Sequence, residues 1–273
     1  MTRAKSTSVR VQSGLIDPKH AAQALLTSSQ AREFDRMAVE RFHMSSLVLM
    51  EHAALGAMRV ALAMAPRGAI VIVAGPGNNG GDALAMARLL RNAGRLVRVI
   101  ALRDEFRGDA GVQRETLGAS RWRVKAWESA SSSSSSSSAS RAKMQRDLSS
   151  ASLIIDGLFG TGLSRTPEGD ALALIQAINN ARGSGSLVLA LDLPSGLHAD
   201  KGVTKRWSAC VVRADVTATF GGFKPGLLTV AARPFVGAII PIDLGVPREI
   251  YKLIRARLVS ETLATRAGTI DHE

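Results

Sequence analysis

Hydrophobic positions follow two different rhythms along this chain. Between residues 28 and 64, apolar side chains recur every three or four positions, which predicts two amphipathic helices, the first capped by Ser28 or Ser29 and the second ending at Met64. Beyond Gly68 the apolar residues gather into short, often β-branched runs that do not alternate with polar residues. Such runs are typical of strands buried on both faces of a sheet.

Seven of these runs are candidate strands, and helical patterns separate several of them. The strand candidates lie at 69–74, 96–102, 122–127, 153–156, 187–192, 216–220 and 238–243. Helical patterns occupy 109–120, 141–149 and 169–182, and another ends near Gly94. Strands that alternate with helices are joined by right-handed crossovers, so we expect an α/β domain with a mostly parallel central sheet covered on both faces. The run at 122–127 has the composition of an edge strand.

The same patterns indicate how the chain is organised. Residues 1–27 are predicted to form a basic N-terminal tail with a short helical piece, and residues 28–273 one domain. A serine tract at 129–140 interrupts that domain. Because serine buries no apolar area, we expect the tract to be a flexible surface loop. The strand–helix rhythm resumes beyond it, which favours an insertion over a domain boundary.

Composition excludes several functional classes. The chain carries 35 Lys and Arg against 23 Asp and Glu, a formal net charge of +12, but only 4% of its residues are aromatic. Aromatic platforms for single strands are therefore missing, and we expect no specific nucleic-acid partner. A single cysteine, Cys210, excludes an internal disulfide, and we expect no apolar run near the roughly 20 residues that span a membrane. The start of the chain lacks the apolar stretch of a secretory signal; a cytoplasmic tail is favoured over an organelle transit peptide.

Polar and glycine-rich segments follow four of the candidate strands. Because the carboxyl ends of parallel strands meet at one edge of a sheet, where ligands bind, these segments are expected to converge on one crevice. The four segments are 75–82, 157–165, 192–196 and 221–226.

The first of these segments has the G-x-G-x-x-G spacing of a dinucleotide-binding turn at 75–80. With Asp104 as a ribose-binding acid, it would indicate an NAD(P)-dependent oxidoreductase, and this alternative stays open. Two residues argue against it: Pro76 removes an N–H donor from the turn, and Asp82 would repel a pyrophosphate at the start of the helix. The paired amides of Asn78 and Asn79 suit a polar ring or a hard cation better.

Two further candidates are acids at strand ends. Asp156 and Asp192 each terminate an apolar run, and a buried carboxylate needs a partner. That partner could be a helix terminus, Arg165 or Lys224, or else a cation or a ligand hydroxyl. Lys224 itself would either close the crevice with a positive charge or be exposed. We favour a functional role for both acids because they fall on the same edge of the sheet.

The order of these segments gives a more specific indication. Five of them together resemble the YjeF N-terminal domain family, the NAD(P)H-hydrate epimerases, from about residue 28 to residue 245. The segments are SLVLMEHAA at 46–54, VIVAGPGNNGGD at 71–82, IIDGLFGTGLSR at 154–165, ALDLPSGL at 190–197 and TATFGGFKPGL at 217–227.

The resemblance implies a Rossmann-like three-layer α/β/α sandwich that interconverts the R and S forms of NADHX and NADPHX, the hydrated forms of NADH and NADPH. It also implies one potassium ion (K+) per subunit, held by Asn79, Asp156 and Ser195, whose oxygens suit a hard cation. The implied substrate contacts are Asn78, Asn79, Gly80, Gly81, Asp82, Gly160, Thr161, Gly162, Leu163, Ser164, Arg165, Thr166 and Asp192. We hypothesise that Asp192, at a strand end facing the glycine-rich loops, handles the proton in catalysis.

The chain also departs from the family's usual pattern. His52 stands where the family usually has Asn, and Ala54 where many members have Gly. The dehydratase often fused to this domain is not expected in this chain, so a separate NAD(P)HX dehydratase would act on the product. An apolar N-terminal helix is compatible with a homodimer. A non-catalytic binding module on the same fold is the other alternative, although the four polar residues Asn79, Asp156, Asp192 and Ser195 argue against it.

Overall fold

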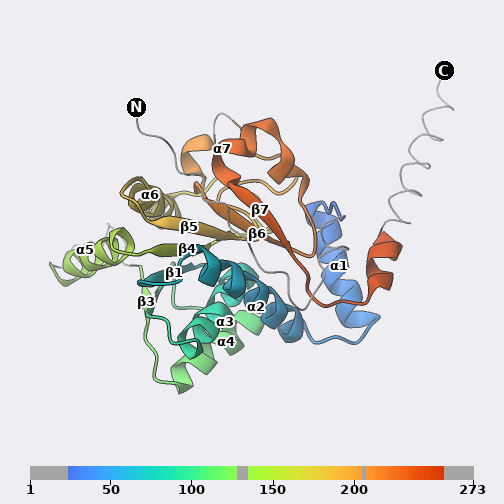
Figure 1. The fold of residues 1–273 in the computed structure, drawn as a ribbon, viewed down its shortest axis with the longest axis horizontal. Coiled ribbons are helices and arrows are strands. Elements are labelled where there is room, and N and C mark those ends of the chain that lie inside the picture. Colours follow the sequence, from blue (N-terminus) through green and yellow to red (C-terminus); the bar gives the residue numbers. More distant parts are fainter. Residues whose placement is uncertain (1–23, 128–134, 205–206, 255–273) are drawn as a thin grey trace.

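The candidate strands come together in one sheet. In this computed structural model, which describes residues 24–127, 135–204 and 207–254, all seven strands run parallel in the order β3-β2-β1-β4-β5-β6-β7 (Figure 1). The expected parallel sheet is therefore confirmed, with the predicted edge strand β3 at its edge. The strands are β1 (Ile70–Ala74), β2 (Val97–Ala101), β3 (Val124–Ala126), β4 (Leu153–Gly157), β5 (Leu187–Leu191), β6 (Val216–Phe220) and β7 (Ala238–Ile242).

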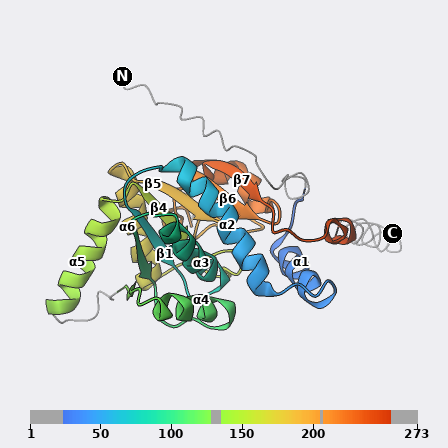
Figure 2. The same ribbon diagram turned by 60° about the horizontal axis from the view of Figure 1, so that its bottom comes forward.

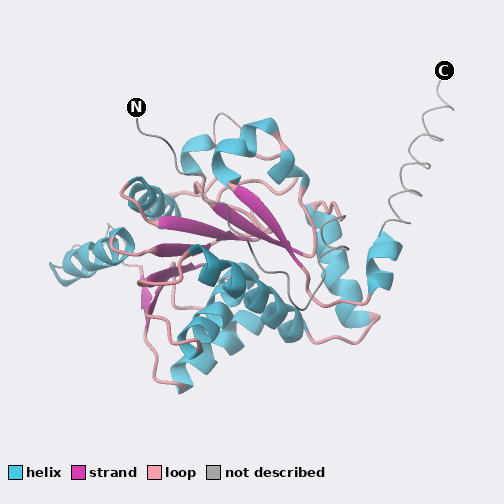
Figure 3. Cartoon of the chain, viewed as in Figure 1, coloured by secondary structure: helices cyan, strands magenta, loops and turns pink. Residues whose placement is uncertain are grey.

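Helices cover both faces of this sheet (Figures 2 and 3). The α-helices of the described residues are α1 (Ser28–Glu40), α2 (Ser46–Met64), α3 (Asn78–Asn92), α4 (Gly108–Ala119), α5 (Ser135–Ser149), α6 (Gly169–Gly183) and the short α7 (Arg233–Val236), and all but α1 belong to the layers on the sheet. The buried strand β1 shows why two layers are needed: Ile70 and Ile72 pack under α2, α3 and α4, whereas Val71 and Val73 pack under α5 and α6. Successive side chains of a strand point to opposite faces, so a strand that is apolar throughout needs helices on both sides.

Helix α1 lies apart from these two layers, at the end of the sheet (Figure 1). It packs in a separate apolar cluster with the segments at 24–26 and 244–254. Its N-cap is Thr27, not Ser28 or Ser29 as predicted, because Thr27 and Gln30 form a reciprocal capping box.

The boundary of the predicted tail is also corrected. Ala24 and Leu26 are buried, and the Leu26 N–H donates to the carbonyl oxygen of Phe223 at 2.8 Å. Residues 24–27 therefore belong to the domain, because their backbone pairs with that of Phe223. Residues 1–23, including the predicted helical piece, lie outside the described residues.

The prediction of a flexible loop is wrong for the second half of the serine tract. Helix α5 begins at Ser135, so 135–140 are helical, and 128–134 lie outside the described residues. Serine has only a moderately unfavourable helix propensity. The helix is fixed by Met144 and Leu148, which are buried under the sheet, and it extends backward from them into the tract.

The expectation that no apolar run is long enough to span a membrane is wrong for helix α2. It has 19 residues with a mean hydropathy of 1.5, so on length and composition alone it could cross a membrane. In the fold, one face of α2 packs into the core: Met50, Ala54, Ala57 and Ala61 are buried against α3 and the sheet.

Candidate active site

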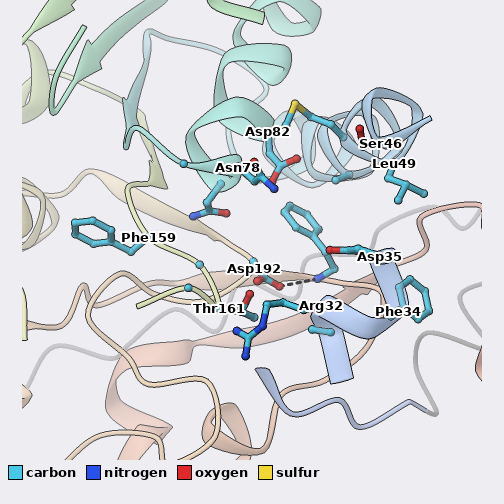
Figure 4. A pocket seen from close by; sticks show the side chains of 18 of the residues that line it. Arg32, Phe34, Asp35, Ser46, Leu49, Asn78, Asp82, Phe159, Thr161 and Asp192 are labelled. Carbon is cyan, nitrogen blue, oxygen red and sulfur yellow. Dashed lines mark hydrogen bonds between the residues drawn. The ribbon is translucent and has the colours of Figure 1, made fainter. Parts of the chain in front are cut away.

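The carboxyl ends of the strands open onto a cavity of about 820 Å³, bounded by the loops after β1, β4 and β5 and walled by α1 and α2 (Figure 4). Most of the predicted substrate contacts line it, and three do not: Gly80, Gly81 and Thr166. The lining members are Asn78, Asn79, Asp82, Gly160, Thr161, Gly162, Leu163, Ser164, Arg165 and Asp192.

The glycine-rich turn after β1 shapes the cavity by close packing. A Cβ atom at Gly80 would meet the carbonyl oxygen of Gly75, and one at Gly75 would meet the carbonyl oxygen of Leu158. At Gly81 a Cβ would meet Met50 and Ala110 on neighbouring helices. These glycines let the start of α3 approach the loop after β4 closely. The side chains that face the cavity from this turn are those of Asn78, Asn79 and Asp82.

The Asn79 side chain, in the first turn of α3, is buried. Within the part of the chain that the structure describes, neither its amide nitrogen nor its amide oxygen has a partner. A buried amide left unpaired costs about 1–3 kcal/mol, which indicates a missing ligand. An oxygen-binding cation such as K+ fits this amide oxygen.

Asp156 lies in β4 and is fully buried. Its carboxylate accepts hydrogen bonds from the Ser195 hydroxyl at 2.6 Å, the Ser195 N–H at 2.8 Å and the Leu158 N–H at 3.3 Å. Burial raises the pKa of Asp156 to about 6, and these hydrogen bonds only partly oppose the shift. The described residues contain no cluster of three or more His, Cys, Asp or Glu that could hold a metal. A hard cation here would use the mixed oxygens of Asn79, Asp156 and Ser195, which fit it.

Asp192 follows β5 and faces the cavity. Its backbone has a φ of 62°, in the left-handed region that Asp tolerates better than most residues. One carboxylate oxygen, Oδ1, accepts from the Lys224 ammonium and from the Phe220 N–H at 3.2 Å. The other, Oδ2, lies beside Gly160, where a Cβ would be 3.3 Å away.

Lys224 is buried, which decides between the two roles left open for it. Besides Asp192, its ammonium donates to the Phe220 carbonyl oxygen at 2.7 Å and to the Thr219 hydroxyl at 3.2 Å. Only 1% of the residue is exposed. The cavity floor therefore presents an ion pair, with Oδ2 of Asp192 as its accessible end.

Two further carboxyl groups face the cavity. Asp82, on α3, is buried, and burial together with the nearby Asp192 raises its pKa well above the ordinary value. Asp35, on α1, is exposed to the cavity; desolvation by the surrounding protein and the charge of Asp192 raise its pKa to about 6, while Lys224 lowers it. The sequence patterns did not single out Asp35, because only its neighbours Phe34 and Met37 carry the helical periodicity.

Comparison with known proteins identifies the family. A sequence model of the family described as "YjeF-related protein N-terminus" matches residues 46–226. The chain belongs to this family. A protein of Rhodopirellula baltica named NAD(P)H-hydrate epimerase is 33% identical, over 83% of this chain and 86% of the relative.

Two other relatives are similar over most of the chain. The "Bifunctional NAD(P)H-hydrate repair enzyme Nnr" of Thermofilum pendens is 35% identical, over 84% of this chain and 42% of that enzyme. A crystal structure of yeast ynu0 has a TM-score of 0.62 at 18% identity, covers 74% of this chain and 82% of that one, and shows the same fold.

One departure from the YjeF pattern now has a structural account. His52 on α2 is partly buried, and its Nδ1 lies 2.7 Å from the carbonyl oxygen of Leu244. This contact ties α2 to the segment after β7. It does not line the cavity.

The ribose-binding role considered for Asp104 loses its support. Asp104 accepts two hydrogen bonds from the Arg114 guanidinium, at 2.6 and 2.9 Å, and is not part of the cavity wall. Asp104 is therefore not placed to bind a ribose beside the glycine turn of this YjeF domain, as a dinucleotide oxidoreductase would need.

Proposed function

We infer that this chain is an NAD(P)H-hydrate epimerase, an isomerase that interconverts the R and S forms of NADHX and NADPHX. The observation that carries the inference is the 33% identity to an epimerase of that name over 83% of the chain. The cavity supports it, because it places an ion-paired carboxylate and an unpaired amide where the family motifs converge.

The chemistry follows from the substrate. Its hydrated carbon bears a hydroxyl group and the ring nitrogen, as in a hemiaminal. The configuration at this carbon is lost when the hydroxyl leaves as water to give an iminium ion, or when the ring opens to an aldehyde. Both routes need proton transfer to or from oxygen, which a positioned carboxyl group accelerates by roughly 10²–10⁴-fold.

We propose Asp192 as the catalytic carboxylate. Lys224 and the Phe220 N–H bind one of its oxygens and fix its direction. The free oxygen faces the loop at 160–165, which borders the cavity. A fixed carboxylate there can accept the proton of an attacking water and stabilise a cationic ring.

We also propose that Asn79, Asp156 and Ser195 hold a K+ ion. The unpaired Asn79 amide and the buried Asp156 carboxylate support this assignment. The ion would supply one positive charge that stabilises ionised Asp156. It would also link the segments after β1 and β4 and hold them in position.

The K+ assignment is tested by thermal unfolding in KCl and in choline chloride at equal ionic strength. A ligand that binds only the folded state at ten times its Kd adds about 1.4 kcal/mol. We expect that gain with KCl, and its loss in Asn79→Ala. Equal unfolding temperatures in both salts would contradict the assignment.

The activity is tested by incubating the purified protein with one NADHX epimer and separating the two epimers by chromatography. We expect the second epimer to appear faster than in a heat-inactivated control. The absorbance of reduced nicotinamide should not appear or disappear with alcohols or ketones. A steady absorbance change without epimer exchange would support the oxidoreductase alternative instead.

We further propose that a separate NAD(P)HX dehydratase acts on the product. The word "bifunctional" in the name of the Thermofilum enzyme supports a second repair activity beside that of the domain matched here. A homodimer and a cytoplasmic location stay predictions.

A further inference from the structure

The helical wall of the cavity carries a carboxyl group that the family motifs leave out. We propose that Asp35 on α1 is the catalytic acid that protonates the departing hydroxyl group, opposite Asp192 as the base. This assignment rests on the proposed epimerase function. It adds a residue from outside the segment at 46–226 that the family model matches.

The fold holds Asp35 in position from both sides. Its neighbour Phe34 is 1% exposed and packs edge-on against Tyr251, with ring centroids 5.1 Å apart. The first turn of α1 is fixed to the rest of the domain by Ser28, whose N–H and hydroxyl both donate to the Asp200 carboxylate at 2.7 Å. A helix anchored in this way can present one side chain to the cavity at a constant place.

The carboxyl groups of Asp35, Asp82 and Asp192 come from three different elements and face the same cavity (Figure 4). Among the described residues, the Asp35 carboxyl has no hydrogen-bond partner, and it is open to the cavity. An unpartnered and accessible carboxyl group on an anchored helix is available to a ligand.

The other candidates are less suited to donate the proton. Asp192 accepts a hydrogen bond from the Lys224 ammonium, so its carboxylate is placed as an acceptor and not as a donor. Lys224 already directs its ammonium protons to Asp192, Phe220 and Thr219. Asp82 is buried in the first turns of α3, whereas Asp35 is open to the cavity, so Asp82 is less accessible to the departing hydroxyl group.

The pKa of Asp35, raised to about 6 by desolvation and by Asp192, suits a group that cycles near neutral pH. Two carboxyl groups in different surroundings, one paired with an ammonium group and one without a partner among the described residues, form a general arrangement for acid and base roles. The charged residues that line the cavity around Asp35 are Arg32, Arg36, Glu40, Asp82, Asp109, Arg165, Asp192 and Lys224.

Asp35 gives its proton to the hydroxyl oxygen, the C–O bond breaks, and one water leaves while the ring nitrogen lone pair forms the C=N bond of the iminium ion. A second water attacks the opposite face of that carbon and releases its proton to Asp192. Water in the open cavity then returns a proton from Asp192 to Asp35. The anion of Asp192 favours this cationic route over ring opening.

The decisive variant is Asp35→Asn, an amide of the same size that cannot donate an acidic proton. We expect kcat at pH 6 to fall by roughly 10²–10⁴-fold, with KM within threefold. In the wild type, kcat/KM should fall about tenfold per pH unit above the pKa of Asp35, because only the protonated acid works. In Asp35→Asn this dependence should disappear.

Two matched variants serve as controls, with circular dichroism and thermal unfolding to verify folding. Glu33→Gln removes one charge from the same helix at a position that does not line the cavity, and should leave kcat and the pH profile unchanged. Asp82→Asn keeps a hydrogen-bond donor and should keep the pH dependence.

The outcomes separate this inference from the proposed function. If the wild type exchanges epimers and folded Asp35→Asn does so at the same rate and with the same pH profile, Asp35 is not the acid. If Asp82→Asn abolishes the pH dependence, the acid is Asp82 and the assignment is overturned. A wild type that exchanges no epimers overturns the proposed function, and this inference with it.

Discussion

The ends of the neighbouring strands β4 and β5 carry the same residue type in very different surroundings. Asp156 is enclosed by backbone and hydroxyl donors from Ser195 and Leu158, and no Lys or Arg of the described residues pairs with it. Asp192, just beyond β5, is paired with buried Lys224 and faces the cavity. On the sequence alone, both acids were equally placed.

This difference assigns the two acids separate roles: Asp156 would hold a cation, and Asp192 would react with the substrate. A buried carboxylate without a cationic side chain still needs a positive charge, which a bound ion can supply. A carboxylate with its own ammonium partner needs none, so its free oxygen is available to a ligand. The predictions below test this division of roles, from the largest expected effect to the smallest.

The largest effect is expected at the end of β5. Asp192→Asn should lower kcat by roughly 10²–10⁴-fold, because the amide cannot accept the proton. It also leaves the Lys224 ammonium without its counter-charge, so we expect the free energy of unfolding to fall by about 3–5 kcal/mol. Epimer chromatography and denaturant unfolding measure the two effects.

A double variant separates these two effects. Adding Lys224→Met to Asp192→Asn removes the uncompensated charge and should restore most of the stability while the enzyme stays inactive. Recovery of epimerisation in the double variant would show that Asp192 only balances Lys224 and has no part in catalysis.

At the end of β4 we expect a smaller effect on activity that depends on the salt. Asp156→Asn should lower activity by about 10–100-fold, as is common when the support of a metal site is lost, and abolish the stabilisation by KCl. In the wild type the KCl effect should shrink as pH falls through the pKa of about 6, because protonated Asp156 no longer attracts a cation. Asp156→Asn with full KCl stabilisation would contradict the division of roles.

Much of the fold was predictable because buried positions require apolar residues, which form a visible pattern in the sequence. Strand β1 is apolar at every position since both its faces are covered, and the edge strand β3 is only half-buried. The cap at Thr27 and the helical start of the serine tract were not predictable, because local hydrogen bonds and distant packing decide them.

The site was predictable only where it lies on the strand ends. Parallel topology brings Asn79, Asp156 and Asp192, which lie at or just beyond the carboxyl ends of strands, to one edge of the sheet, so their convergence followed from the pattern. The ion pair of Asp192 with Lys224 and the presence of Asp35 depend on how distant segments pack. No periodicity in the sequence encodes those contacts.

Gly160, in the loop after β4, lies beside Asp192 and Asn79, and its substitution should give an intermediate effect. A Cβ there would lie 3.3 Å from Oδ2 of Asp192, so this oxygen must shift by a few tenths of an ångström, whereas the 3.5 Å distance to the Asn79 side chain is an ordinary contact. We expect Gly160→Ala to lower kcat/KM about tenfold, since small displacements of reacting groups are costly. Gly162→Ala, where a Cβ meets nothing, is the matched control. Equal activity of the two variants would mean that this contact does not position Asp192.

The smallest effect is expected away from both strand ends, at His52. His52→Asn removes the contact between Nδ1 and the Leu244 carbonyl oxygen, and should lower the free energy of unfolding by about 0.5–1.5 kcal/mol. Activity should stay within twofold, because His52 does not line the cavity. The matched control is His43→Asn at an exposed position with a φ of 54°, which Asn tolerates well, so its stability should not fall. A tenfold loss of kcat in His52→Asn with unchanged stability would show that α2 acts on the chemistry, and that the division between Asp156 and Asp192 does not account for the whole site.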